Sequence, residues 1–560
     1  MAKCIKRAGI VFFVAIVLCL LLIVSFGVTN TGDSQALNTE QEIEVVNAVP
    51  VNPELEYALV AANSTEMAKL WNEKIQEAVD TRKHIKLVLG NNWLAPTTEA
   101  LHKFGEGVGF DGGRIYVPHF CTITLDLNGY SINRGLSKDN PVSLGNVIKV
   151  CGTLNVTDSK YKADEVKNII TNGALDSLQN YACGKITGGS RIDNVYGGGG
   201  IFVEEYGTLN FYGGMICDNF AVNGGAIHIR TNSTMNMYGG IIVNNKSSLY
   251  GGGIYLAENT KSKANDIVIY NNVGAGGGIF LNTGAELDMN NINVVKSSSN
   301  SNGGGVYVNN ASLTATNITV TDNISNSAGG GICVSGTASN LNLTNFNLSN
   351  NTANYGGGIV FVGGGEGKIK DGSISNNTAK AAGGGLHIVE KSKVQITNCD
   401  LLNNQANSAG GGCFLGEKVD VDINGAQIKN NQAESGGGIY YGTANMSFSG
   451  KVECSNNSSI DETDNLFIET QNKILIKGVL EKVEGGNGIF IALNNNSKFS
   501  SFTSGFASSG NINASIFKSQ DGKGAAKVIG GEVVFDYYSE NVYDFIYLEE
   551  NERKSYKEND

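Results

Sequence analysis

The sequence predicts an all-β fold, a right-handed single-stranded parallel β-helix with an N-terminal α/β cap. A glycine run recurs ten times between Gly198 and Tyr441, at steps of 25 to 27 residues. Apolar and polar residues alternate between these runs, as in strands, and no helical period appears among them. A unit of about 26 residues cannot bury an apolar face alone, but stacked units can share one continuous core.

The glycine runs mark one corner of every repeat. Each run is followed by an apolar, a variable and an apolar residue, as in Ile254, Tyr255 and Leu256. Glycine allows positive φ and close backbone approach, which a tight corner needs. The first glycines of the ten runs are Gly198, Gly224, Gly251, Gly276, Gly303, Gly329, Gly356, Gly383, Gly410 and Gly436.

A column of asparagines gives each repeat a second mark, because each lies three residues after an apolar residue. Asparagine tolerates the left-handed region, and its amide can stack on the amide of the next turn. We expect a buried structural ladder that is broken at Ser298, where the period places the next member. The members are Asn219, Asn245, Asn272, Asn323, Asn351, Asn377, Asn404, Asn431 and Asn457.

The glycine runs together with the double-asparagine corners resemble a known repeat. Such corners stand at Asn350-Asn351, Asn376-Asn377, Asn403-Asn404 and Asn430-Asn431. The pattern is similar to the repeats of chlamydial polymorphic membrane proteins and related bacterial adhesin-like surface proteins, over roughly half of the chain. The resemblance implies a pectate-lyase-like solenoid and a role at the cell surface.

The N-terminal segment, residues 1–36, indicates a signal peptide or an N-terminal membrane anchor. Lys3, Lys6 and Arg7 precede an uncharged apolar run over 8–28. Basic residues before such a run place the N-terminus inside and the remainder outside. The run is longer than a usual signal-peptide core, which favours an uncleaved anchor.

The remaining chain divides into a cap, turns and a tail. A capping box of Asn63 and Glu66 starts a predicted helix over about 64–81. The expected parts are a linker and N-terminal cap over 37–115, first irregular turns over 116–197, regular repeats over 198–460, closing turns and a C-terminal cap over 461–535, and a charged tail over 536–560.

Charge and cysteine usage exclude several partners. A net charge of −12 argues against nucleic acid and anionic membrane surfaces as partners, so the membrane enters only through the N-terminal segment. The cysteines show no Cys-x-x-Cys pair, and Cys413 takes a position that other repeats fill with Ile or Val. We expect no cofactor and no metal site.

The variable residue of each glycine-run triplet gives a candidate binding column. Strand alternation points it away from the core, and six of its ten members are aromatic. We expect an exposed strip that binds glycan or protein ligands; alternatively, the rings stabilise the sheet or are covered by a loop. The column contains Phe202, His228, Tyr255, Phe280, Tyr307, Cys333, Val360, His387, Phe414 and Tyr440.

Catalytic residues are not evident. Asp420 and Asp422 point the same way on one strand, roughly 6 to 7 Å apart, within reach of glycosidase spacing. With no neighbouring basic or aromatic clamp, a solvated strand face is the better interpretation. Glu204, Glu205 and Arg230 could form a small polar site at a loop edge, or be solvated.

These features favour an exported, non-enzymatic, adhesin-like protein, extracellular or at the cell surface, that binds glycan or surface-protein ligands. The alternative is a carbohydrate-active β-helix enzyme, a polysaccharide lyase or a glycoside hydrolase. Such an enzyme should bring three or more acidic or basic residues together on one face of adjacent turns. A trimeric phage-type spike is a third class; the oligomeric state and the ligand stay open.

Overall fold

The computed structural model describes residues 53–96, 102–192, 197–459, 465–468, 472–493 and 500–537. The predicted leader (1–36), the linker up to residue 52 and the charged tail from residue 538 lie outside the described residues. Among the residues described, no helix is long and apolar enough to cross a membrane.

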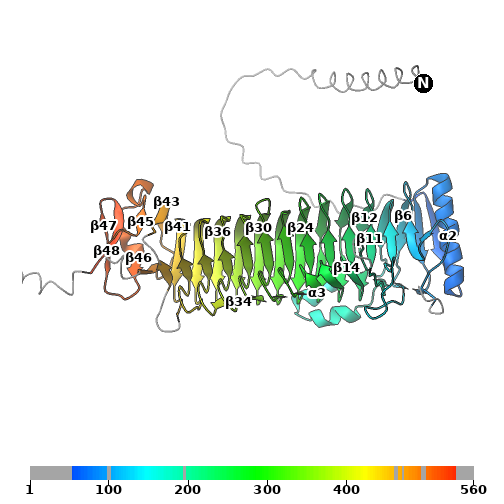
Figure 1. Cartoon of the computed structure of the whole chain (residues 1–560), viewed down its shortest axis with the longest axis horizontal. Helices are drawn as coiled ribbons and strands as arrows, with labels where there is room; N and C mark the ends of the chain where they lie inside the picture. Colours follow the sequence, from blue (N-terminus) through cyan, green and yellow to red (C-terminus); the bar gives the residue numbers. More distant parts are fainter. Residues whose placement is uncertain are drawn as a thin grey trace, which may run out of the picture. The chain divides into compact units, whose positions relative to one another are not determined.

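The described chain forms a parallel β-solenoid of about 16 turns, which confirms the predicted all-β fold (Figure 1). Strands of successive turns pair in parallel and in register. Each regular turn contributes one strand after the glycine run, one long strand and one short strand. Residues one repeat apart in the sequence are therefore direct neighbours in space.

The strands fall into three columns. The glycine-run strands are β5 (Arg114–Val117), β8 (Ile148–Val150), β11 (Ile201–Val203), β15 (Ile227–Ile229), β19 (Ile254–Leu256), β23 (Ile279–Leu281), β26 (Val306–Asn309), β29 (Ile332–Ser335), β32 (Ile359–Val362), β35 (Leu386–Ile388), β38 (Cys413–Leu415), β40 (Ile439–Tyr441), β42 (Leu466–Ile468), β44 (Ile489–Leu493) and β46 (Phe517–Ser519). The short strands are β14 (Phe220–Asn223), β18 (Lys246–Tyr250), β22 (Val273–Ala275), β25 (Ser298–Ser299), β28 (Ile324–Ser325), β31 (Thr352–Ala353), β34 (Thr378–Ala379) and β37 (Gln405–Ala406).

The long strands are split in the first turns and continuous later. The first halves of the split long strands are β1 (Leu55–Leu59), β2 (Ile85–Leu89), β6 (Thr122–Asp126), β9 (Thr153–Thr157), β12 (Thr208–Phe211), β16 (Thr234–Met237) and β20 (Lys261–Asn265). Their second halves are β3 (Trp93–Leu94), β7 (Ser131–Asn133), β10 (Lys185–Thr187), β13 (Met215–Cys217), β17 (Gly240–Val243) and β21 (Ile267–Tyr270). The continuous strands are β24 (Glu286–Val295), β27 (Ser312–Thr321), β30 (Asn340–Ser349), β33 (Glu366–Ser375), β36 (Lys393–Leu402), β39 (Asp420–Lys429) and β41 (Asn445–Ser455), followed by β43 (Ile474–Glu481) and β45 (Thr503–Ser504).

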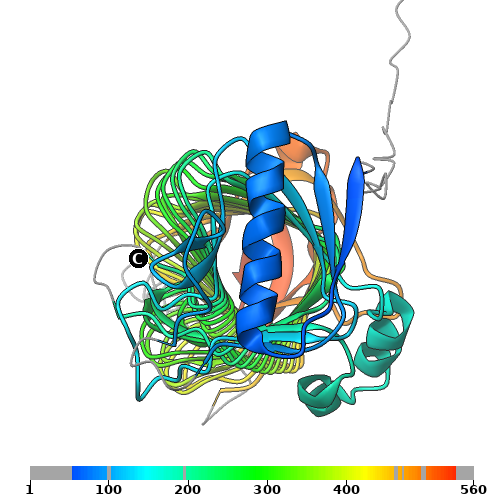
Figure 2. The ribbon, with the colours of Figure 1, turned by 90° about the vertical axis from the view of Figure 1, so that its right-hand side faces the viewer.

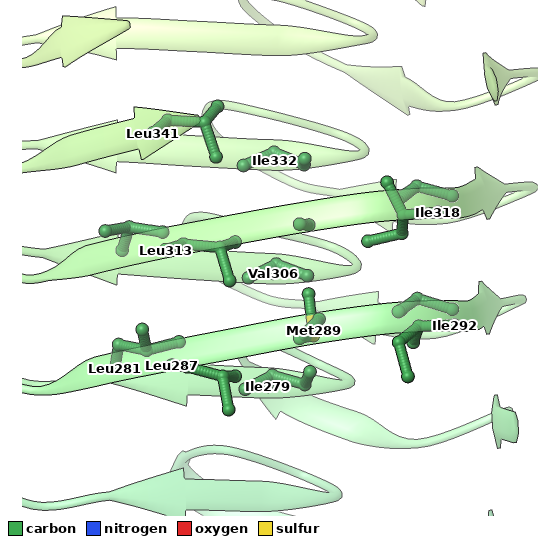
Figure 3. Packing of buried hydrophobic residues seen from close by; sticks show 14 of the residues in the cluster. Ile279, Leu281, Leu287, Met289, Ile292, Val306, Leu313, Ile318, Ile332 and Leu341 are labelled. Carbon is green, nitrogen blue, oxygen red and sulfur yellow. The ribbon is translucent and has the colours of Figure 1, made fainter. Parts of the chain in front are cut away.

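The core is a stack of aliphatic side chains that alternation points inward. Ile279 pairs with Val306, and Leu287 with Leu313, in the next turn (Figure 3). These residues are at most 1% exposed. Each such side chain contributes about 1.5–3 kcal/mol when fully buried, which is what a single turn cannot obtain alone.

Caps cover both open ends of this core. Helix α2 (Ser64–Thr81) lies across the N-terminal end (Figure 2) and buries Met67, Trp71 and Ile75 there. The Asn63 side chain accepts a hydrogen bond from the Glu66 backbone at 3.0 Å, as the capping motif predicts. At the other end, the hairpin of β47 (Ala525–Ile529) and β48 (Glu532–Asp536) buries Phe535 against the core. Two short 3₁₀ helices, η3 (Ala507–Ser509) and η4 (Ala514–Ile516), precede this hairpin in the chain. The covered ends remove edges that could pair with other chains.

A helical insertion lies outside the solenoid in the span where only irregular turns were expected. It consists of α3 (Ala163–Thr171) and the 3₁₀ helix η1 (Leu175–Asn180). Val166 and Leu178 pack on outward-facing apolar residues of the long strands, among them Ile241 and Val268. A helix this short depends on such packing, which its own sequence does not reveal. The short hairpin of β4 (Phe110–Asp111) with β5 belongs to the same first turns.

The asparagine column forms a buried ladder along one corner. Asn351 donates from its backbone N–H and from Nδ2 to Oδ1 of Asn377, at 2.9 and 3.0 Å. Its Nδ2 also donates to the carbonyl oxygen of Val320 at 2.9 Å. The same pattern links Asn219 to Asn245 and runs from Asn323 to Asn457, then on to Asn465.

The break in the ladder lies at Ser297, one residue before the position expected from the period. The Ser297 hydroxyl accepts from the Asn272 backbone at 3.4 Å, and its own N–H donates to Oδ1 of Asn323 at 2.9 Å. The preceding repeat is one of 25 residues, so a uniform period overshoots by one. Serine keeps the main-chain link but offers no amide.

The two asparagines of each corner have different roles. Asn350, Asn376, Asn403 and Asn430 have φ of 56–58° and turn the chain, while the residue that follows each carries the buried amide. The double asparagine therefore combines a conformational residue with a hydrogen-bonding one.

We predict that Asn377→Leu lowers the free energy of unfolding by about 1–3 kcal/mol, because it leaves two donors of Asn351 without an acceptor in the interior. Equilibrium denaturation by circular dichroism measures the change. Asn376→Gly is the matched control, since this exposed neighbour needs only a positive φ, which glycine adopts readily. Equal midpoints for the parent and both variants would contradict a stabilising ladder.

Candidate functional site

The predicted aromatic column points away from the core, but most of it is buried. Phe202, His228 and Phe280 are at most 3% exposed, and Tyr255 and His387 are 8% exposed. The expectation of an exposed strip is therefore wrong over these turns. Cys333 and Val360 are buried as well, and only Tyr307, Phe414 and Tyr440 of the column are partly exposed.

The glycine runs themselves cover this column. A Cβ on Gly383 would lie 2.6 Å from Cβ of His387, and one on Gly303 would lie 2.7 Å from Cβ of Tyr307. The chain that enters each strand thus folds back over the strand's outward residue. Strand alternation specifies which way a side chain points, but not what lies beyond it.

The rings also cover one another. Phe414 stacks between His387, at 4.8 Å and 7°, and Tyr440, at 5.1 Å and 8°. Tyr250, from the bulged strand β18, lies 4.5 Å from Phe280. The ring faces are used within the stack, so this column cannot offer a row of flat faces to a ligand.

A hollow on the outer face of the long strands brings together the polar residues of six turns. It has a volume of about 610 Å³ and spans β30, β33, β36, β39, β41 and β43. We call it the polar groove. Its polar side chains are Asn340, Glu366, Lys368, Lys393, Gln395, Asp420, Asp422, Asn445, Ser447, Lys473 and Lys477.

The surroundings of Asp420 and Asp422 correct the expectation that no basic clamp lies near. Lys393 pairs with Asp420 in register, and Lys477 forms an ion pair with Asp422. Asp420 also accepts a hydrogen bond from Nδ2 of Asn445 at 2.7 Å. Each strand supplies only one or two of these residues, so the cluster appears only when the turns are stacked.

Asp422 is held in its ionised form. Partial burial acts to raise its pKa, but hydrogen bonds from Lys477 and Ser447 outweigh burial and keep the pKa below its ordinary value. A carboxylate in this state can accept hydrogen bonds and attract cations. It is poorly suited to donate a proton.

A second hollow adjoins the polar groove at the preceding corner. Its volume is about 960 Å³, and we call it the Phe414 hollow. Its apolar wall is formed by Phe414, Val389 and Gly416, and charged residues of the turns surround it. Glu366 and Lys393 line both hollows, so the two lie side by side.

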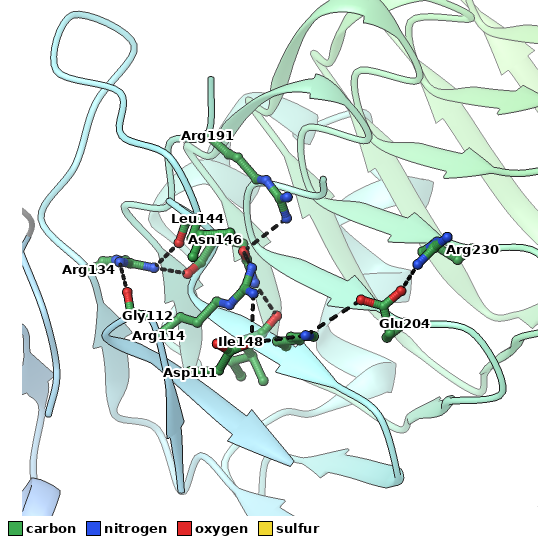
Figure 4. Close-up of polar contacts among 11 residues, drawn as sticks. Asp111, Gly112, Arg114, Arg134, Leu144, Asn146, Ile148, Arg191, Glu204 and Arg230 are labelled. Atoms are coloured by element: carbon green, nitrogen blue, oxygen red, sulfur yellow. Dashed lines mark hydrogen bonds and ion pairs between the residues drawn. The ribbon is translucent and has the colours of Figure 1, made fainter. Parts of the chain in front are cut away.

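Glu204 and Arg230 belong to a separate charged network on the first turns (Figure 4). Glu204 forms ion pairs with Arg230 and, at 3.6 Å, with Lys149, which in turn lies 2.9 Å from Asp111. Glu205 instead accepts a hydrogen bond from Asn232 at 3.1 Å. The network therefore joins neighbouring turns through contacts within the protein.

Arg134 anchors the inner end of this network. It is fully buried, and its guanidinium donates to the carbonyl oxygens of His102, Leu144 and Asn146. Burial, followed by the charges of Arg114 and Arg191, lowers its pKa to about 9. Its partners are main-chain carbonyls, so we interpret the residue as a clamp on the first loops.

Metal-ligand clusters are not found within the described ranges, where no three His, Cys, Asp or Glu side chains converge. His228 and His387 lie six turns apart in the buried column. Cys413 is buried in the core, at 1% exposure, in the place of an aliphatic residue.

No family model matches the chain, and comparison with curated proteins and with solved structures also finds no match.

We predict that the buried histidines weaken the fold in acid. Burial lowers the pKa of His228 to about 3 and that of His387 to about 4. The unfolded chain takes up these protons near pH 6.5. Above pH 6.5 the histidines therefore cost no stability. Below it, each histidine lowers the free energy of unfolding by up to about 1.4 kcal/mol for every pH unit, until the pH reaches the pKa of that histidine in the folded protein.

His228→Phe, which suits a place between Phe202 and Tyr255, should reduce this loss between pH 7 and pH 5. Urea unfolding at several pH values measures it, with the exposed His119→Gln as control. A slope in His228→Phe as steep as in the parent would refute the assignment.

Proposed function

We propose that the protein is an exported, adhesin-like protein that binds an extended glycan along the polar groove. The resemblance of its repeats to those of chlamydial polymorphic membrane proteins and the apolar, basic-flanked N-terminal sequence support export and a place at the cell surface. The observation that carries glycan binding is the row of hydrogen-bonding side chains across six consecutive turns.

The groove suits a ligand that repeats along the solenoid axis. Neighbouring turns are about 4.8 Å apart, so six turns span about 24 Å. Its side chains stand on strands whose backbone pairs continuously, as in β33–β36 and β36–β39. A rigid surface of this kind loses little entropy when a long chain binds.

The polar groups of the groove are available to a ligand. Glu366 and Lys393 lie 3.4 Å apart but remain 54% and 62% exposed. Exposed pairs of this kind contribute at most about 1 kcal/mol. Sugar hydroxyls, which both donate and accept, can take over such contacts without a large cost.

A carbohydrate-active enzyme is the second candidate, because the groove meets the criterion set from the sequence. Glu366, Lys393, Asp420, Asp422 and Lys477 lie on one face of adjacent turns. A glycoside hydrolase needs one protonated and one ionised carboxyl group, and Asp422, which is held ionised, cannot be the proton donor. We favour binding, which needs only the row of hydrogen-bonding side chains, and an assay for new reducing ends tests hydrolysis directly.

We predict that the full-length chain binds at least one polysaccharide in a glycan screen. Asp420→Ser and Lys393→Ser should each weaken this binding about ten-fold, which corresponds to about 1.4 kcal/mol, because each removes contacts in the groove. Lys261→Ser is the matched control. Lys261 occupies the same column and pairs with Glu286 at 3.2 Å, but it lies outside the groove.

Dissociation constants from calorimetry measure the effect, and thermal unfolding confirms that the variants fold. Parental affinity in both groove variants would exclude the groove as the binding surface.

A further inference from the structure

We propose that the ligand is an uncharged polysaccharide that carries acetamido groups, with its chain in the polar groove and one acetamido methyl group in the Phe414 hollow. This inference rests on the proposed function and adds the class of glycan. Two features support it: the arrangement of charges in the groove, and the shape and polarity of the hollow.

The charges in one row of the groove alternate in sign over three successive turns. Glu366, Lys393 and Asp420 lie directly opposite one another in successive turns. The groove contains four lysines and three carboxylates, a balance of 4 − 3 = +1, against −12 for the chain. A polymer with a charge on each unit would meet a like charge on at least one of these three turns, which opposes binding.

Hydroxyl groups do not have this difficulty. Each can donate to a carboxylate and accept from a lysine, so an uncharged sugar chain can satisfy both rows of side chains. Groups of the groove that already bond to each other, such as Asp420 with Asn445, keep their partners when the ligand adds further bonds. The alternation of charge thus selects neutral glycans over polyuronates and polyamines.

The Phe414 hollow lies where glycine replaces valine along one column of the solenoid. Val362, the last residue of β32, and Val389, just after β35, occupy this position in two successive turns, and the next two turns have Gly416 and Gly442 there. A Cβ at Gly416 would lie 2.8 Å from Cγ1 of Val389 and 3.5 Å from Cε1 of Phe414. The missing side chain leaves an opening toward the edge of the Phe414 ring.

The opposite wall of the hollow is also low. Gly363 and Gly364 form the turn there, with φ of 69° and 85°, beside Thr337. The floor is therefore apolar, while the neighbouring groove is polar. A small substituent with a methyl end on a sugar fits this combination, and among uncharged sugars the acetamido group provides one.

The test uses three oligosaccharides of similar length on the full-length chain: chito-oligosaccharides, cello-oligosaccharides and oligogalacturonates. The first two share one backbone and differ in the acetamido group, and the third is anionic. We expect chito-oligosaccharides to bind about ten-fold more tightly than cello-oligosaccharides, and oligogalacturonates to bind more weakly than both.

Gly416→Val narrows the hollow with the residue that the two preceding turns carry; its Cβ would lie 2.8 Å from Cγ1 of Val389, so the Val389 side chain must shift to admit it. It should lower the affinity for chito-oligosaccharides about ten-fold and leave that for cello-oligosaccharides unchanged. Val362→Ala, at the equivalent position outside both hollows, should change neither. Thermal unfolding of each variant verifies the fold.

The outcomes separate the two proposals. Equal affinities for the two neutral ligands, or no effect of Gly416→Val, would overturn the acetamido inference and leave groove binding intact. Tightest binding to oligogalacturonates, lost in Lys393→Ser, would overturn the preference for uncharged chains. No binding of any glycan, or binding that ignores Lys393→Ser and Asp420→Ser, would overturn the proposed function as well.

Discussion

The structure depends on the hydrogen-bonded ladder of asparagine amides along one corner of the solenoid. A corner that turns inside a core leaves main-chain groups without partners, and an unpaired buried group costs about 1–3 kcal/mol. Asn377 removes this cost for its neighbour by accepting two hydrogen bonds from Asn351. Because every amide links two turns, the ladder also sets their register.

Because the register of the turns is fixed, residues one repeat apart in the sequence form continuous rows on the surface. Glu366, Lys393 and Asp420 are 27 residues apart in the chain, yet they form one row on the outer face. All polar residues of the groove except Lys473 stand on strands, so its geometry is as rigid as the sheet that carries it. The neighbouring hollow lies where one column of the solenoid changes from Val389 to Gly416.

The glycine runs have two effects that share one cause. Without side chains, the chain can turn tightly into each strand and lie directly over the strand's outward residue. A second layer of side chains results outside the core, in which His387, Phe414 and Tyr440 stack on each other. These rings stabilise the solenoid, and the buried histidines make that stability depend on pH.

The sequence by itself determined the fold, because the repeat length, the alternation and the asparagine column each report on local geometry that every turn must satisfy. It also located the capping box at Asn63. A uniform period misplaced the break by one residue, at Ser298 instead of Ser297, since the repeats vary in length. Only the tertiary structure decided which surfaces are open. Strand alternation gives the direction of the Phe280 side chain, but it does not reveal the Tyr250 ring that covers it. The partners of Asp420 and Asp422 stand on other turns, and only the stacking of the turns brings these residues together.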